Sequence, residues 1–244
     1  MSRRVTFATA RRVLAQLRRD PRTLALVFVV PPVLITILHF VFSGEPGVFD
    51  RVGGPMVGIF PFATMFVVTS IAMLRERTSG TLERLMTLPL AKIDILLGYG
   101  IAFAAIATVQ ASITSAIAFG ALGLHVHGSI AVVVALAVAN AVLGMSIGLL
   151  MSAFARTEFQ AVQFMPAVVF PQLLLCGLLV PRARMDHVLE WISYALPLSW
   201  AFDALSHAVR GSGNGIIARD ALIVVAITVA ALGLAATTLR RRTP

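Results

Sequence analysis

Residues 95–155 read ILLGYGIAFAAIATVQASITSAIAFGALGLHVHGSIAVVVALAVANAVLGMSIGLLMSAFA and contain no Asp, Glu, Lys or Arg. These 61 residues are too many for one helix across a bilayer. An apolar core of about 30 Å needs only about 20 helical residues. The polar turn at residues 123–128 divides the stretch, and the sequence therefore predicts two membrane-spanning helices, over residues 95–123 and 129–155.

Four further stretches lack charged residues and have the length of a span: residues 23–44, 52–74, 159–181 and 221–239. The whole chain is apolar in the same way, with 58% hydrophobic and only 13% charged residues, whereas about a quarter of residues are charged in soluble domains. The prediction is an all-α, polytopic membrane protein in which residues 1–244 form one transmembrane domain with six transmembrane helices.

The basic residues are distributed unevenly about these spans. With six spans, 15 of the 20 Lys and Arg fall on the side that holds both termini, and 5 fall on the other. The positive-inside rule then places both termini in the cytoplasm of a multi-pass plasma (inner) membrane protein. Basic residues beside apolar runs indicate membrane lipid rather than nucleic acid as their partner. Lys92 is the one lysine, and this preference for arginine favours a bacterial source.

Residues 1–22 predict an N-terminal amphipathic, interfacial helix. Arginines recur at seven-residue intervals, and Ala10, Val13, Leu14 and Leu17 share one helical face. Such a helix lies on the cytoplasmic membrane surface. The alternative is a helical charge cluster that only sets the topology.

Residues 182–220 predict an extracytoplasmic re-entrant segment with two short helices that are separated at Pro197. One apolar face consists of Val188, Leu189, Ile192 and Leu196, and the second of Leu198, Ala201, Leu205 and Ala208. The two helices would dip into the outer leaflet, and an interfacial hairpin fits almost as well.

Residues 75–94 form the loop between the second and third spans. Within it RERTSGTLERLMTLP, residues 75–89, predicts a short polar helix that Pro89 ends. Such a helix, with leucines and carboxylates on its surface, is a docking site for another protein. An ordinary loop helix that packs on its own bundle explains the pattern equally well.

Motifs for chemistry are missing from the sequence. It has no glycine-rich phosphate-binding loop and no His-Glu-x-x-His, and the predicted spans contain no Asp, Glu, Lys or Arg. Cys176 is the single cysteine, so no cysteine-based metal cluster is expected. We expect no enzymatic activity and no cofactor or metal on this chain.

The loop resembles the cytoplasmic motif of type-2 ATP-binding-cassette (ABC) exporter permeases, roughly Glu-Arg-x-x-Gly-Thr-Leu-Glu-x-Leu followed by Pro. The matching residues are Glu76, Arg77, Gly80, Thr81, Leu82, Glu83, Leu85 and Pro89. The basic N-terminal helix and the run at residues 196–200, LPLSW, are also similar to this family. Ser206 and His207 separate Leu205 from Arg210 more widely than the family does, which shifts the register there.

The resemblance implies half of a transporter that pairs with a second permease copy or a sister permease. A separate cytoplasmic ABC ATPase subunit would hold ATP and Mg²⁺ and dock on the loop as on a coupling helix. Glu76 and Glu83 would contact it, and Leu82 and Leu85 would anchor the helix. The substrate would be a hydrophobic or amphipathic drug, lipid or glycan moving out of the cytoplasm. The alternative is a membrane anchor that recruits a cytoplasmic partner and transports nothing.

Overall fold

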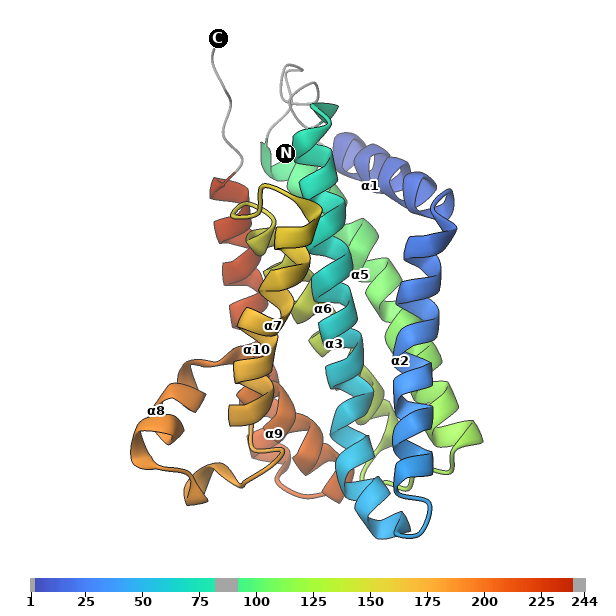
Figure 1. Ribbon diagram of the computed structural model, residues 1–244, viewed down its shortest axis with the longest axis vertical. Helices are drawn as coiled ribbons and strands as arrows, with labels where there is room; N and C mark the ends of the chain where they lie inside the picture. The colour runs from blue at the N-terminus through green and yellow to red at the C-terminus, as the bar shows by residue number, and fades with distance from the viewer. Residues whose placement is uncertain (1–2, 82–91, 239–244) are drawn as a thin grey trace.

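The computed structural model describes residues 3–81 and 92–238, and every regular element in these ranges is helical (Figure 1). The helices are α1 (Arg3–Arg18), α2 (Pro21–Val41), α3 (Pro46–Thr78), α5 (Lys92–Ala116), which continues as a π-helix (Ile117–Ala121), α6 (Ile130–Met151), α7 (Glu158–Leu175), a 3-10 turn (Arg182–Arg184), α8 (His187–Ala195), α9 (Pro197–Arg210) and α10 (Asn214–Thr237). The all-helical prediction is confirmed for these residues.

Five of these elements are long and apolar enough to cross a membrane: α2, α3, α5 with its π-helical end, α6 and α10. The predicted fifth span corresponds to α7, which ends at Leu175 after 18 residues and contains Pro166 and Pro171. It does not reach residue 181 as a helix, because residues 176–181 are irregular. The described structure therefore has five candidate spans, and a sixth stays a prediction.

The closest helix contact joins α3 and α6. A Cβ placed on Gly144 would lie 2.1 Å from the carbonyl oxygen of Phe62, and one on Gly148 would lie 2.4 Å from that of Phe66. Thr69 Oγ1 donates a hydrogen bond to the carbonyl of Met145 across this contact, at 3.1 Å. Glycines four residues apart allow two membrane helices to approach at backbone distance. The sequence contains this Gly-x-x-x-Gly spacing, but hydropathy does not distinguish these two glycines from the rest of the apolar stretch.

The apolar face of α1 packs against protein. Ala10, Val13 and Leu17 are buried, while Leu14 is exposed, and a Cβ on Gly98 of α5 would lie 2.5 Å from Thr9 Cβ. Helix α1 is thus attached to α5 along its length. The surface helix expected from the sequence is present, but most of its predicted membrane-facing side is used to hold it on the bundle.

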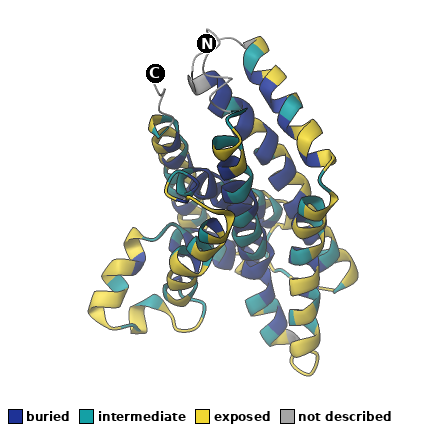
Figure 2. Cartoon of the chain, turned by 45° about the horizontal axis from the view of Figure 1, so that its top comes forward, coloured by how far each residue is buried: buried dark blue, intermediate teal, exposed yellow. Residues whose placement is uncertain are grey.

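Helices α8 and α9 occur where the break at Pro197 predicted them, but their environments differ. The apolar face of α9 is buried against α3 and α6, and Leu205 Cδ1 lies 2.6 Å from the Cβ position of Gly58. Glycines in α3 give the apolar face of α9 a place against protein rather than lipid, and the re-entrant position of residues 182–220 stays a prediction. Helix α8 projects from the bundle, with Val188 64% and Trp191 67% exposed (Figure 2).

Apolar side chains also remain uncovered along α2 and α10, whose most apolar stretches are each only 22% buried. These surfaces require lipid or another chain. Helix α10 begins at Asn214, seven residues before the predicted start of the span, and it therefore includes Arg219 and Asp220. Asp220 is fully buried and pairs with Arg219 at 2.8 Å in the part of α10 that precedes the predicted charge-free span.

Candidate functional site at the loop end of the bundle

The end of α3 lies at one extremity of the bundle, together with α1, the start of α5 and the end of α10 (Figure 1). Helix α3 continues through Thr78 and is capped at Ser79. Gly80 then adopts φ +71°, a left-handed conformation in which glycine commonly ends a helix. Residues 75–78 therefore belong to α3 rather than to a separate loop helix, and Gly80 prevents a continuous helix from Glu76 onward.

Glu76 faces α1. Its carboxylate accepts hydrogen bonds from Arg12 at 3.4 Å and from Gln16 at 3.1 Å, and its side chain is only 12% exposed. Arg12 also donates to the hydroxyl of Tyr99 in α5 and lies 5.6 Å from the centre of the tyrosine ring. Three helices are thus joined through one carboxylate and one guanidinium.

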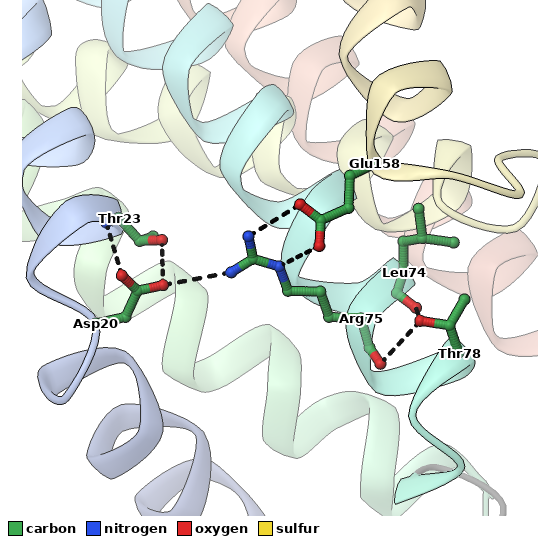
Figure 3. Close-up of polar contacts among 6 residues, drawn as sticks. All are labelled: Asp20, Thr23, Leu74, Arg75, Thr78 and Glu158. Atoms are coloured by element: carbon green, nitrogen blue, oxygen red, sulfur yellow. Dashed lines mark hydrogen bonds and ion pairs between the residues drawn. The ribbon is translucent and has the colours of Figure 1, made fainter.

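Arg75 faces the opposite way and binds two carboxylates (Figure 3). Its Nε and one terminal nitrogen donate to the two oxygens of Glu158 at 2.7 and 3.0 Å, and the other terminal nitrogen lies 3.4 Å from Asp20. The planar guanidinium suits this two-point contact with a carboxylate. Asp20 also caps α2 by accepting from the backbone N–H of Thr23 at 3.2 Å, and it accepts from the Thr23 hydroxyl at 2.7 Å.

These contacts favour the ionised carboxylates. Hydrogen bonds from Thr23, together with the charge of Arg75, hold the pKa of Asp20 below its ordinary value. The hydrogen bonds and charge of Arg75 likewise lower the pKa of Glu158. Both ion pairs therefore persist at neutral pH.

Arg77 completes the series by donating to the Thr238 hydroxyl at 3.0 Å, directly after α10. Three consecutive side chains at the end of α3 thus contact different parts of the bundle: Arg75 the start of α2 and α7, Glu76 α1, and Arg77 the end of α10. A displacement of the end of α3 cannot occur without altering these contacts.

A cavity of about 480 Å³ opens between α1, α2, α3 and α5 below this network. Asp20, Arg22, Arg75 and Glu76 form its polar end, and Leu17, Leu26, Val68, Ile71 and Phe103 are among its apolar lining residues. Its chemistry suits an amphiphile or a lipid chain. Within the described residues, no three His, Cys, Asp or Glu side chains are placed to hold a metal ion.

The residues predicted from the sequence therefore divide into two groups. Glu76, Arg77, Gly80 and Thr81 are described, and Thr81 lies 2.9 Å from Ser79 through their hydroxyls. Leu82, Glu83, Leu85 and Pro89 lie outside the described residues. The predicted docking role of Glu76 stays a prediction, and its carboxylate is engaged within the chain.

The sequence analysis did not predict the hydrogen bonds and ion pairs at the loop end that involve Asp20, Arg75, Glu158, Arg12 and Tyr99. Asp20, Arg75 and Glu158 flank long charge-free stretches, so hydropathy places them at helix ends. Hydropathy does not say which helix ends meet, and no spacing rule connects residues 20, 75 and 158.

Comparison with known proteins gives the family. Residues 4–209 match the family described as ABC-2 type transporter. The chain is 31% identical over 156 residues to ABC transporter G family member 20 of Dictyostelium discoideum, which covers 64% of this chain and 21% of that protein.

Two Escherichia coli proteins are also similar. The one named Probable multidrug ABC transporter permease YbhR is 28% identical over 178 residues, covering 73% of this chain and 48% of its own length. Inner membrane transport permease YhhJ is 27% identical over 179 residues, covering 71% and 48%. The chain spans about half the length of these two permeases and about a fifth of the Dictyostelium protein. With its apolar helices, the match over most of its length shows that this chain belongs to the ABC-2 type transporter family as a membrane permease component.

Proposed function

We propose that this chain is the transmembrane permease subunit of an ATP-driven exporter. It moves a hydrophobic or amphipathic substrate, such as a drug, lipid or glycan, out of the cytoplasm, and a separate ABC ATPase subunit supplies the energy. The E. coli relative YbhR is named as a probable multidrug transporter permease, which supports this substrate class.

One observation carries the coupling part of the proposal. Arg75, Glu76 and Arg77 attach the end of α3 to α1, α2, α7 and the residue after α10, at the start of the segment that the family resemblance identifies as the ATPase docking loop. Movement of a docked ATPase would pull on α3 and, through these three residues, on four other parts of the bundle. In this proposal Glu76 and Arg77 transmit movement, and Leu82, Glu83 and Leu85 contact the ATPase.

The proposed topology has six crossings, with α7 as the fifth and both termini in the cytoplasm. Helix α7 begins beside Arg75, which lies at the loop end, and α8 and α9 follow at the other end (Figure 1). The surplus of Lys and Arg on the side of the termini supports the cytoplasmic assignment. The apolar surfaces of α2 and α10 provide area for lipid and for a second permease copy.

Co-purification with the ABC ATPase encoded beside this chain tests the proposal. Glu83→Lys combined with Leu85→Asp reverses one docking charge and places a carboxylate in the apolar contact, so we expect loss of the ATPase at unchanged membrane abundance. Gly233→Ala is the matched control, because a Cβ at this position meets nothing within 4 Å.

A second measurement separates transport from anchoring. The co-purified complex in liposomes should show ATP-dependent movement of a fluorescent amphiphile, and the docking variant should not. A complex that forms and hydrolyses ATP with the docking variant at wild-type levels would contradict the assignment of the loop. A stable complex that moves no amphiphile would favour the anchoring function.

A further inference from the structure

A second cavity of about 480 Å³ lies beside α9, at the end of the bundle opposite the loop (Figure 1). Its wall is formed by the start of α3, the segment after α7, the 3-10 turn and α9. The charged residues that line it are Arg51, Arg182, Arg184, Asp203 and Arg210, and Val52, Leu178, Leu179, Pro181 and Phe202 contribute apolar surface. Four arginines thus face one carboxylate, and the charged lining has a formal net charge of +3.

This concentration of arginine is unexpected on topological grounds. The predicted outer side has only five basic residues in all, and four of them line this one cavity. They come from positions as distant as 51 and 210. The fifth, Arg219, pairs with Asp220 in α10. Because the positive-inside rule disfavours basic residues on this side, their convergence requires a reason other than membrane insertion.

The arginines are only partly neutralised. Arg182 pairs with Asp203 and is nearly buried, and its Nη1 is buried without a hydrogen-bond partner. Arg51, Arg184 and Arg210 are exposed, and none of them has a carboxylate within 4.0 Å among the residues that the structure describes. Guanidinium groups at such positions form strong, two-point hydrogen bonds with phosphate or carboxylate oxygens.

The aromatic residues beside the cavity indicate that it lies at the height of the lipid headgroups. The Arg182 guanidinium lies 4.9 Å from the ring centre of Tyr194 and 5.5 Å from that of Trp200. Trp and Tyr concentrate at the height of lipid headgroups. The exposed Leu179 beside the arginines provides a place for an acyl chain.

We propose that this cavity binds a phosphate group that carries net negative charge, on an anionic lipid headgroup or on a soluble phosphate compound. Arg51, Arg184 and Arg210 contact the phosphate oxygens, and Arg182, held by Asp203, offers its free Nη1 from the inner wall. The site binds at equilibrium without ATP, so the proposal does not depend on transport by this chain.

The test uses the detergent-purified full chain and native mass spectrometry, with phosphatidylglycerol as the anionic probe and phosphatidylcholine as the zwitterionic one. We expect preferential retention of phosphatidylglycerol. Arg184→Gln combined with Arg210→Gln should weaken this binding by at least about tenfold, since one charged hydrogen bond corresponds to roughly a factor of ten. Arg184→Lys combined with Arg210→Lys should retain part of the affinity. Arg18→Gln combined with Arg156→Gln removes the same charge at the opposite end and should leave the tight binding unchanged.

Inorganic phosphate distinguishes the two sources. Competition of phosphate with phosphatidylglycerol in the wild-type protein identifies a headgroup site. A phosphate-dependent rise in melting temperature, absent in the glutamine variant and without any lipid preference, identifies a soluble ligand. If the wild-type protein shows neither lipid preference nor a response to phosphate, the proposal is wrong, whatever the variants do.

Discussion

The contact between α3 and α6 makes a sharp prediction for Gly144→Ala. The new Cβ would lie 2.1 Å from the carbonyl oxygen of Phe62, whereas ordinary contacts begin at 3.4 Å. The obstacle is backbone, so no side-chain rotation relieves it, and α3 must move away from α6 by more than 1 Å at this point. Phe62 and Phe66, both fully buried, would lose contacts as the helices separate.

Overpacking of this kind costs about 1–3 kcal/mol. For a chain of this size, 1 kcal/mol corresponds to roughly 2–4 °C in melting temperature, so we expect a fall of about 2–12 °C in detergent. Gly233→Ala in α10 is the control, because its Cβ enters open space and alanine favours helix over glycine by up to about 1 kcal/mol. A thermal-shift assay in which Gly144→Ala melts at or above the wild type would refute the close approach of α3 and α6.

Three further predictions concern other contacts. Arg75→Gln should cost about 0.2–1 kcal/mol for each of its two partly exposed ion pairs. Because both partner carboxylates have pKa values lowered from their ordinary 3.8 and 4.5, the stability is present above these values and is lost as pH falls below them, where melting curves of the wild type and the variant should approach each other. Gln172→Leu removes the acceptor for a buried backbone N–H at the start of α9 and should cost about 1–3 kcal/mol by thermal shift, so an unchanged melting temperature would contradict the contact. In the topology test, a membrane-impermeant maleimide should label Ser43→Cys in intact cells and Ser79→Cys only after permeabilisation, with little background from the buried Cys176; the reverse pattern would overturn the proposed orientation.

Much of the architecture follows from hydropathy. The expected breaks at residues 123–128 and at Pro197 both occur, and the helix boundaries of α2 and α6 differ from the predicted ones by a few residues. Water and lipid act on each residue locally, so a long run without charge identifies a helix whatever its neighbours are. The sequence shows the apolar face of α9 but not the surface of α3 on which that face packs, because the two surfaces come from distant parts of the chain.

The candidate site divides in the same way. The loop motif and the family resemblance predict that residues 75–89 dock a partner, and the structure shows how Glu76 and Arg77 are held. No feature of the sequence indicates that Arg75 binds Asp20 and Glu158, because these residues are separated from it by more than fifty positions and approach it only through helix packing.

The sequence by itself determined the class of the protein: its apolar runs require helices in a membrane, and its loop motif indicates the family, because both properties belong to short segments. Only the tertiary structure decided which helix ends lie next to one another. The network around Arg75 and Glu76 and the arginine cavity at the far end depend on how the helices pack, which is set by close approaches such as those at Gly58, Gly98 and Gly144. Such approaches depend on surfaces that come together from distant parts of the chain, and a pattern along the sequence does not record them.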